Sequence, residues 1–236
     1  MPNLPFQEND IQQLIAHCHA SLDMTSLKVA EEYGYANLPL CVIDAVFSIG
    51  VNYKSTENTI NRFCNHFGIS KLIAEGVENQ PEFSIADFIQ LYEENSIEFM
   101  TRQIYRNSQR TSTRNGILKA EAALRVAETL AKFDVNYTPD VAKVINAPAF
   151  EVAFRQIPGQ RSGISLRYFY MLAGSEENIK PDRMIMRFIQ TAVGRRANVD
   201  ECHLLLVETC RRLSVDYPEL TPRALDHQIW QFQRIQ

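Results

Sequence analysis

The sequence predicts an all-α fold, and three observations lead to this prediction. Apolar residues recur three and four positions apart, as in the stripe of Ile11, Leu14, Ile15 and Cys18, which is the spacing of one helix face. No stretch alternates apolar and polar residues as a half-buried strand would. The segments between apolar runs are short and carry residues that begin and end helices. We therefore expect ten or eleven helices joined by short connections.

In the first half of the chain, capping residues and glycines mark the helix ends. The run Leu40–Ile49 is apolar nearly throughout and ends at Gly50, which predicts a helix buried on all sides. Gly68 ends a later helix in the same way. The expected helices are Ile11–Leu22 after Asn9 or Asp10, Leu40–Ile49, a helix capped by Ser55 or Thr56 that reaches Phe67, a short turn at Ser70–Glu75, Ile85–Tyr92 capped by Ser84, and Ile97–Ile104 after Ser96.

In the second half, prolines stand near the start of several expected helices, where the missing N–H of proline costs nothing. Gly174 is a natural end for one of them. The expected helices are one that follows Ala120 and ends at Phe133, one from near Pro139 to Ile145, Ala149–Gln156 after Pro148, Ile164–Ala173, Arg183–Val193, Val199–Leu213 and Pro222–Phe232.

Length and composition fit a folded protein of one large or two small domains. The chain has 236 residues, of which 45% are hydrophobic, so it can bury a sizeable core. It has no run of about 18 apolar residues, so we expect no transmembrane helix. The start MPNLPFQEND lacks a signal-peptide pattern, so we expect a cytoplasmic protein, nucleoid-associated if bacterial. The five scattered cysteines show no Cys-x-x-Cys spacing, which argues against a disulfide framework or zinc site.

The charge is unevenly distributed along the chain. The net charge is −4, which by itself does not indicate a nucleic-acid-binding protein. Residues 1–100 hold 4 basic and 14 acidic side chains, a balance of −10, so the remainder carries −4 − (−10) = +6. The second part of the chain therefore suits a surface that faces phosphates.

The stretch Ile157–Phe188 combines a tight turn, a helix and an aspartate at the start of the next helix. Ile157-Pro158-Gly159 ends one helix, because proline cannot continue the backbone ladder and glycine allows a left-handed turn. A second helix begins near Ile164 and is followed by a polar loop. Asp182 ends that loop and precedes another apolar-periodic segment.

This stretch resembles the helix-hairpin-helix DNA glycosylases, the endonuclease III family. Their pattern is a helix, a hairpin close to Leu-Pro-Gly-Val-Gly, a second helix and a short loop to an essential aspartate. Ile157-Pro158-Gly159 matches the start of the hairpin, and Asp182 takes the place of that aspartate. Arg161 replaces the second glycine of the hairpin, and Gly163 stands where lyase-type members carry a catalytic lysine. The four-cysteine iron–sulfur cluster of many relatives is missing, so we expect no cofactor and no metal.

The resemblance implies two helical domains with the active site in the cleft between them. One would be a helical barrel over residues 36–174 that ends in the helix-hairpin-helix, and the other would combine 1–35 with 175–236. Three further segments are similar to the family: Asp44–Gly50 to the buried helix that ends at the pocket, Gly116–Ala120 to a Gly-x-x-x-Lys-Ala helix start, and Asp226–Trp230 to the histidine-bearing last helix.

On this resemblance, the hairpin binds the backbone of double-stranded DNA. Backbone N–H groups at a glycine turn, together with the start of the next helix, form an anion site. Arg161 would occupy a left-handed position that glycine fills freely, yet its cation could bind the same phosphate. The alternative is an ordinary packing corner between two helices. The residues assigned to DNA binding are Pro158, Gly159, Gln160, Arg161, Ser162 and Gly163.

Asp182 is the candidate catalytic residue. Cleavage of an N-glycosidic bond develops positive charge on the sugar, which a carboxylate can stabilise while it orients or deprotonates the attacking water. An N-cap is the alternative role, and one residue can serve both. Gly163 supplies no amine for a Schiff base, and no lysine occurs between Lys143 and Lys180. We therefore expect a monofunctional glycosylase that does not cut the strand.

The segment after the early buried helix would line the base pocket. By the resemblance, Ser48, Gly50, Asn52 and Tyr53 hold the flipped base or fill the gap that it leaves in the duplex. Tyr53 is the wedge candidate, and Gly50 leaves room for a larger base. The alternative is a glycine helix end followed by a tyrosine that faces the core.

Four arginines recur every fourth residue: Arg102, Arg106, Arg110 and Arg114. On one continuous helix they would form a single face. Such a face could follow DNA phosphates, or it could simply be solvated.

Taken together, the sequence leads us to expect a monomeric DNA glycosylase of the base excision repair type, with double-stranded DNA as its partner and no membrane association. The alternative is a non-catalytic DNA-binding or lesion-recognition module on the same fold. A third reading is an all-helical interaction protein without a nucleic-acid partner. The target base stays open among oxidised, alkylated, deaminated and hypermodified bases.

Overall fold

The structure, a computed structural model, describes residues 6–24, 34–72 and 82–235. Within these ranges the regular structure consists of eleven α-helices, one π-helical segment and one 3₁₀ helix. Strand pairing in the same ranges is limited to two isolated bridges, Tyr35 with Leu72 and Arg110 with Leu118. The prediction of an all-α protein is therefore confirmed.

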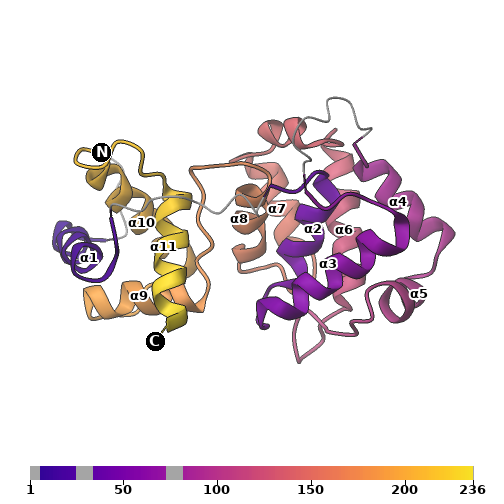
Figure 1. Ribbon diagram of the computed structural model, residues 1–236, viewed down its shortest axis with the longest axis horizontal. Coiled ribbons are helices and arrows are strands. Elements are labelled where there is room, and N and C mark those ends of the chain that lie inside the picture. The colour runs from indigo at the N-terminus through magenta and orange to yellow at the C-terminus, as the bar shows by residue number, and fades with distance from the viewer. Residues whose placement is uncertain (1–5, 25–33, 73–81, 236) are drawn as a thin grey trace. The chain divides into compact units, whose positions relative to one another are not determined.

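The chain divides into two compact units (Figure 1). Unit 1 combines residues 1–31 with 174–236, and unit 2 comprises residues 32–173. In unit 1 the N-terminal helix α1, drawn in indigo, packs with the orange and yellow helices from the end of the chain. The first and last parts of the sequence thus share one hydrophobic core.

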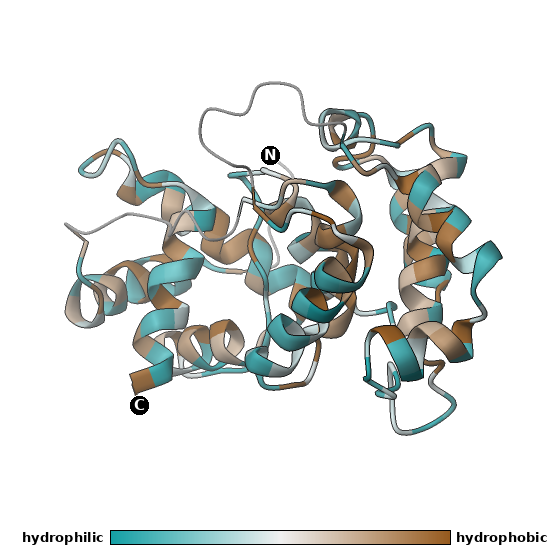
Figure 2. Ribbon diagram, turned by 45° about the vertical axis from the view of Figure 1, so that its right-hand side comes forward, coloured by the Kyte–Doolittle hydropathy of each residue, from teal (hydrophilic) through white to brown (hydrophobic). Residues whose placement is uncertain are grey.

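Unit 1 is built from amphipathic helices whose apolar faces meet. Its helices are α1 (Glu8–Ser21), α9 (Arg183–Val193), α10 (Val199–Leu213) and α11 (Pro222–Ile235). In α9 the residues Ile185, Phe188, Ile189 and Val193 are buried, which is the three-and-four spacing expected of one helix face. The separation of hydrophobic and hydrophilic faces can be followed in Figure 2.

Unit 2 is organised around a helix with no exposed residue. All ten residues of α2 (Leu38–Phe47) are buried, as the apolar run predicts, and α2 packs against α3, α6 and α8. The elements of unit 2 are α2, α3 (Tyr53–Phe67), α4 (Ile85–Glu94), α5 (Ile97–Phe99), the π segment η2 (Met100–Ile104), α6 (Lys119–Lys132), the 3₁₀ helix η3 (Thr138–Lys143), α7 (Pro148–Gln156) and α8 (Ile164–Leu172).

The carboxyl end of α2 is satisfied by a buried lysine. Lys119 is only 3% exposed, and its Nζ donates to the carbonyls of Phe47 at 2.8 Å and Ile49 at 2.9 Å. The last carbonyls of a helix have no partner within the helix. The ammonium of Lys119 supplies that partner and joins the start of α6 to the end of α2.

Most helix ends fall close to where the sequence predicts them, but the starts of α1 and α3 do not. The prediction that Asn9 or Asp10 caps the first helix is wrong, because α1 begins at Glu8 with Gln7 as its N-cap. Ser84 caps α4 in a capping box with Asp87, and Gly68 ends α3 with a φ of 66°. The prediction that Ser55 or Thr56 caps α3 is wrong. Asn52 is the cap, because its side-chain oxygen accepts the N–H of Lys54 at 2.9 Å. The helix therefore begins at Tyr53, before both predicted caps.

The turn expected at Ser70–Glu75 can be followed only in part. Residues 70–72 are not helical, and the rest of that turn lies outside the described residues. All five cysteines are buried, and none forms a disulfide. Among the described helices, none has the length and hydrophobicity needed to cross a membrane.

The four arginines at every fourth position do not lie on one continuous helix, so they do not form a single helical face. Arg106 adopts a left-handed conformation with a φ of 48°, and the N–H of Asn107 returns to the carbonyl of Thr101 at 3.1 Å. This is the hydrogen bond that closes a helix after a left-handed residue. Asn107 is further held by donating to Thr59 Oγ1 at 3.0 Å. Arg110 and Arg114 consequently lie in the connection between η2 and α6.

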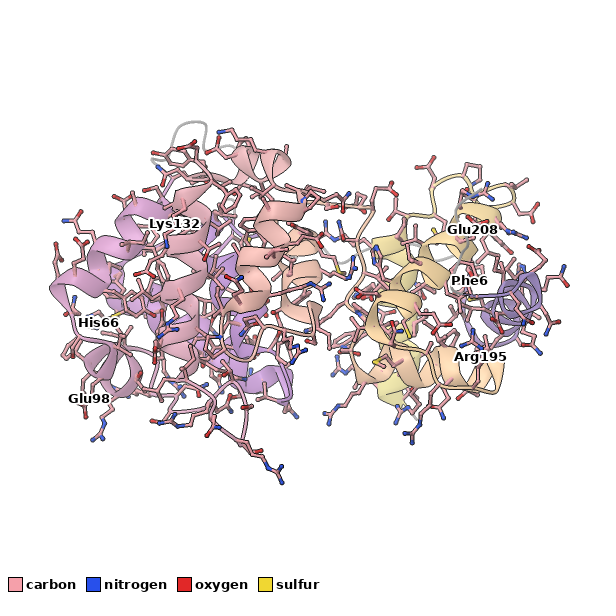
Figure 3. All side chains as sticks on the ribbon, turned by 180° about the vertical axis from the view of Figure 1, so that it is seen from behind. Phe6, His66, Glu98, Lys132, Arg195 and Glu208 are labelled. Atoms are coloured by element: carbon pink, nitrogen blue, oxygen red, sulfur yellow. The ribbon has the colours of Figure 1, made fainter. Side chains whose placement is uncertain are left out.

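In unit 1, one arginine links α1 to the start of α10. Arg195 Nη2 lies 2.6 Å from Asp10 Oδ2, and its Nη1 lies 2.7 Å from Glu201 Oε1. Arg195 is labelled in Figure 3. Both carboxylate side chains are about nine-tenths buried. The hydrogen bond from Arg195 holds the pKa of Asp10 below its ordinary value.

Replacement of Arg195 by methionine is expected to destabilise the protein by about 1–3 kcal/mol, because two largely buried carboxylates lose their partner. The matched control is Arg125→Met, which removes a more exposed pair with Glu121 and is expected to cost about 0.5 kcal/mol or less. The free energy of unfolding from urea titration measures both. Since the pKa of Asp10 is lowered in the folded state, the difference between wild type and Arg195→Met should shrink as the pH falls below about 4. Equal losses for the two variants would contradict this role of Arg195.

Candidate functional site

The connection between α7 and α8 is a tight turn with two left-handed glycines. Gly159 has a φ of 87° and Gly163 a φ of 76°. Two backbone bonds close the turn, from Gln160 N to the carbonyl of Ile157 at 2.9 Å and from Gly163 N to the carbonyl of Gln160 at 3.0 Å. The two short helices therefore meet at a compact turn that ends at the first residue of α8.

Space also requires the glycine at position 159. A Cβ at Gly159 would lie 2.2 Å from Thr111 Cβ, whereas one at Gly163 would meet only the flexible end of the Arg155 side chain, 2.6 Å from Nη2. Arg161 is not among the residues with positive φ. The expectation that Arg161 strains a left-handed position is therefore wrong, because the turn assigns its left-handed positions to Gly159 and Gly163.

The turn presents donors that the rest of the described structure does not use. Within the described residues, the backbone N–H groups of Gly159, Arg161 and Ser162 donate to no protein acceptor, and these three residues are exposed. The N–H of Ile164, the first residue of α8, already donates to Ser162 Oγ at 3.4 Å, so it does not add to this set. Gln160 is buried and accepts from the hydroxyl of Ser165, which fixes the turn from inside. Such a set of donors suits an anion.

Asp182 lies in unit 1 as the N-cap of α9. Its Oδ1 accepts the N–H of Met184 at 2.7 Å and of Ile185 at 3.3 Å. Its Oδ2 has no hydrogen-bond partner in the part of the chain that the structure describes. The capping role is therefore confirmed, and one carboxylate oxygen stays available for a water or a ligand.

A second carboxyl group, which the sequence analysis missed, is tied to the same loop. Asp226 of α11 is 7% exposed, and its Oδ1 accepts the N–H of Lys180 at 2.9 Å. The carbonyl of Lys180 in turn accepts the N–H of Asp182 at 2.6 Å. Burial first, and then the negative charge of Asp182, raise the pKa of Asp226 to about 8. Asp226 is therefore mostly neutral at pH 7. The sequence signal for this buried carboxyl group was an aspartate among the apolar residues of an amphipathic helix.

The four residues proposed for the base pocket occupy the α2–α3 connection of unit 2. Ser48 is buried, and its N–H donates to the carbonyl of Asp44 at 3.0 Å. Gly50 and Asn52 are exposed. Tyr53 is half-buried, and its hydroxyl donates to Asp44 Oδ2 at 3.2 Å. The tyrosine is thus held toward the interior, while the wedge assignment stays a prediction.

Asp44 brings this segment together with α8. Its Oδ2 accepts hydroxyl hydrogens from Tyr35 at 2.8 Å, Tyr53 at 3.2 Å and Tyr168 of α8 at 3.3 Å. Asp44 is fully buried, so these hydroxyls replace water around its carboxylate. Burial, and then the charge of Asp44, raise the pKa of Tyr35 far above its ordinary value. A single acid within the apolar run of α2 was the signal for this cluster.

The described residues contain no cluster of three or more histidine, cysteine or acidic side chains that could hold a metal ion. The chain belongs to the family described as a domain of unknown function (DUF8548), whose model matches residues 12–234. No curated protein and no solved structure matches the chain.

Substitution of Gly159 by alanine is expected to cost about 1–3 kcal/mol more stability than substitution of Gly50 by alanine. Both glycines have a positive φ, so both substitutions carry the backbone cost of about 1 kcal/mol. Gly50 has open space around it, whereas a Cβ at Gly159 collides with Thr111. Chemical denaturation of the two variants measures the difference. Equal losses would mean that the turn can move away from Thr111 at no cost.

The replacement Asp226→Asn is expected to raise stability at pH 7–8 by about 1–4 kcal/mol. The folded pKa of Asp226 is raised to about 8, so its protonated form stabilises the fold at low pH and this contribution is lost as the pH rises from about 4 to 8. Asparagine keeps an oxygen for the N–H of Lys180 and cannot ionise. Unfolding free energies between pH 5 and 8 should therefore fall less steeply in the variant. An unchanged slope would show that Asp226 does not titrate in this range.

Proposed function

We propose that this protein is a monofunctional DNA glycosylase that flips a modified base out of duplex DNA and hydrolyses its bond to deoxyribose. The observation that carries the proposal is the state of Asp182, whose Oδ1 is fixed by two N–H donors while its Oδ2 has no partner among the described residues. A carboxylate that is both held in place and available is what this hydrolysis needs.

The chemistry assigned to Asp182 follows from the charge that develops during cleavage. As the bond to the base breaks, the sugar becomes positively charged, and a nearby carboxylate lowers the energy of that state. The same carboxylate can orient the attacking water and accept its proton. Because Asp226 is mostly neutral at pH 7, it adds little negative charge beside Asp182.

The α7–α8 turn is assigned to the DNA backbone, as a helix-hairpin-helix element. Its exposed N–H groups at Gly159, Arg161 and Ser162 suit one phosphate, and Arg161 adds a cation. Contacts of this kind position a protein on DNA without reading sequence. Pro158, Gln160 and Gly163 shape the turn that presents these donors.

Gly163 supports hydrolysis rather than lyase chemistry. A lysine at this position would need a left-handed backbone, and its Cβ would lie against the guanidinium of Arg155. Lys180 offers its backbone N–H to Asp226 and is not needed for a mechanism that uses water. The proposal is therefore base release that leaves an intact strand with an abasic site.

The second candidate is a non-catalytic DNA-binding or lesion-recognition module. The helix-capping hydrogen bonds of Asp182 favour this second candidate. An aspartate whose only role is to cap α9 would accept the same N–H groups of Met184 and Ile185. The two candidates share the DNA surface and differ only in whether Asp182 acts on a substrate.

The variant Asp182→Asn separates them. Asparagine caps a helix about as well as aspartate, so the fold is retained while the negative charge is lost. Duplexes that each carry one modified base are incubated with protein, and abasic sites are revealed with hot alkali. The proposal expects alkali-dependent cleavage for wild type and a loss of at least about 100-fold in Asp182→Asn.

The control variant is Asp140→Asn, which removes another helix-capping carboxylate in unit 2 and should leave base release unchanged. Cleavage without alkali would overturn the monofunctional mechanism. DNA binding without base release over a broad panel of bases would favour the binding module.

A further inference from the structure

Two segments of unit 2 lack acidic residues altogether. Residues 99–120 contain no Asp or Glu and five basic residues, and residues 152–173 contain no Asp or Glu and three basic residues. In a chain with a net charge of −4, two such stretches are an uneven distribution. The first includes the connection between η2 and α6, and the second includes the α7–α8 turn.

These two segments touch each other. The side chain of Thr111 lies so close to Gly159 that a Cβ there would be 2.2 Å from Thr111 Cβ. The connection around Thr111 is itself ordered, since Thr111 N donates to the carbonyl of Ile117 at 2.9 Å and Lys119 N donates to that of Gln109 at 2.9 Å. Because Gly159 has no side chain, the connection around Thr111 packs directly against the α7–α8 turn.

Four arginines of this joint surface have no carboxylate partner among the described residues. Arg106, Arg110, Arg114 and Arg161 are exposed, and none forms an ion pair with a described residue. Other exposed arginines do pair with acids: Arg102 of the first segment pairs with Glu98, Arg125 with Glu121 and Arg211 with Glu208. In unit 1, the exposed Arg183 and Arg196 likewise form no ion pair with a described residue, so what distinguishes the four arginines is that they gather on two touching segments without acids. Uncompensated cations gathered on two touching segments create a positive potential that favours a polyanion.

We propose that the connection around Thr111 is a second phosphate-binding element, which holds the DNA backbone next to the phosphate bound by the α7–α8 turn. Arg114 is three residues from Thr111, and Arg161 is two residues from Gly159. Chain geometry keeps their Cα atoms within about 25 Å of each other. At a rise of about 3.4 Å per nucleotide, the surface spans several phosphates. The inference rests on the proposed function in taking duplex DNA as the ligand.

The experiment compares single variants from the two elements. Binding of a fluorescent duplex of about 20 base pairs is measured by anisotropy between about 50 and 200 mM salt. Arg114→Ala and Arg161→Ala should each weaken binding and reduce the slope of log affinity against log salt by about 1. Arg102→Ala should change neither, because Arg102 is engaged with Glu98. Arg114→Lys should restore the slope, since lysine keeps the charge.

The outcomes separate this inference from the proposed function. If Arg161→Ala lowers the slope and Arg114→Ala behaves like Arg102→Ala, the second element is refuted and DNA binding by the turn stands. If wild type binds no duplex at any salt concentration, the inference and the proposed function fall together. Thermal unfolding checks that each exposed substitution leaves the fold intact, so that a loss of binding reports the contact itself.

Discussion

The burial of α2 is the constraint on which unit 2 depends, and Lys119 makes this burial possible. The last carbonyls of a helix with no exposed residue cannot accept hydrogen bonds from water. A buried carbonyl without a hydrogen-bond partner lowers stability by about 1–3 kcal/mol. Lys119 Nζ donates to the carbonyl of Phe47, the last residue of α2, and to that of Ile49 just beyond it. Midway along α2, Asp44 Oδ2 accepts hydrogen bonds from tyrosine hydroxyls of three other parts of unit 2. The polar groups of one buried helix thus fix the elements around it.

The proposed DNA surface is anchored to that same helix. The connection that carries Arg114 runs directly into Lys119, which holds the end of α2. The α7–α8 turn runs into α8, whose Tyr168 donates to Asp44. Each basic segment is therefore exposed at its tip and tied to the core at its end. This combination lets uncompensated cations be held in place without carboxylates beside them, and a preorganised cationic surface binds phosphates at a lower entropic cost.

In unit 1, Asp182 caps a helix with one carboxylate oxygen and leaves the other oxygen available for a water or a ligand. One oxygen is used by the first turn of α9, and the other has no partner among the described residues. Asp226 holds the preceding Lys180 through its backbone N–H. Its burial raises its pKa, so it contributes a hydrogen-bond acceptor with little charge at neutral pH. The loop before α9 is therefore positioned by a group that does not strongly repel Asp182.

The sequence by itself determined the features that depend on near neighbours: the all-α fold, the burial of α2, and the helix start at Asp182. Periodicity and capping act within a few residues, so they can be inferred from sequence. Only the tertiary structure decided what depends on distant partners. Asp44 meets Tyr168 across 124 sequence positions and Lys119 meets Phe47 across 72, and no local pattern encodes such pairs. The every-fourth spacing of the arginines would suit one helix face, but the chain turns left-handed at Arg106 and Asn107 donates to Thr59, 48 positions away in the chain.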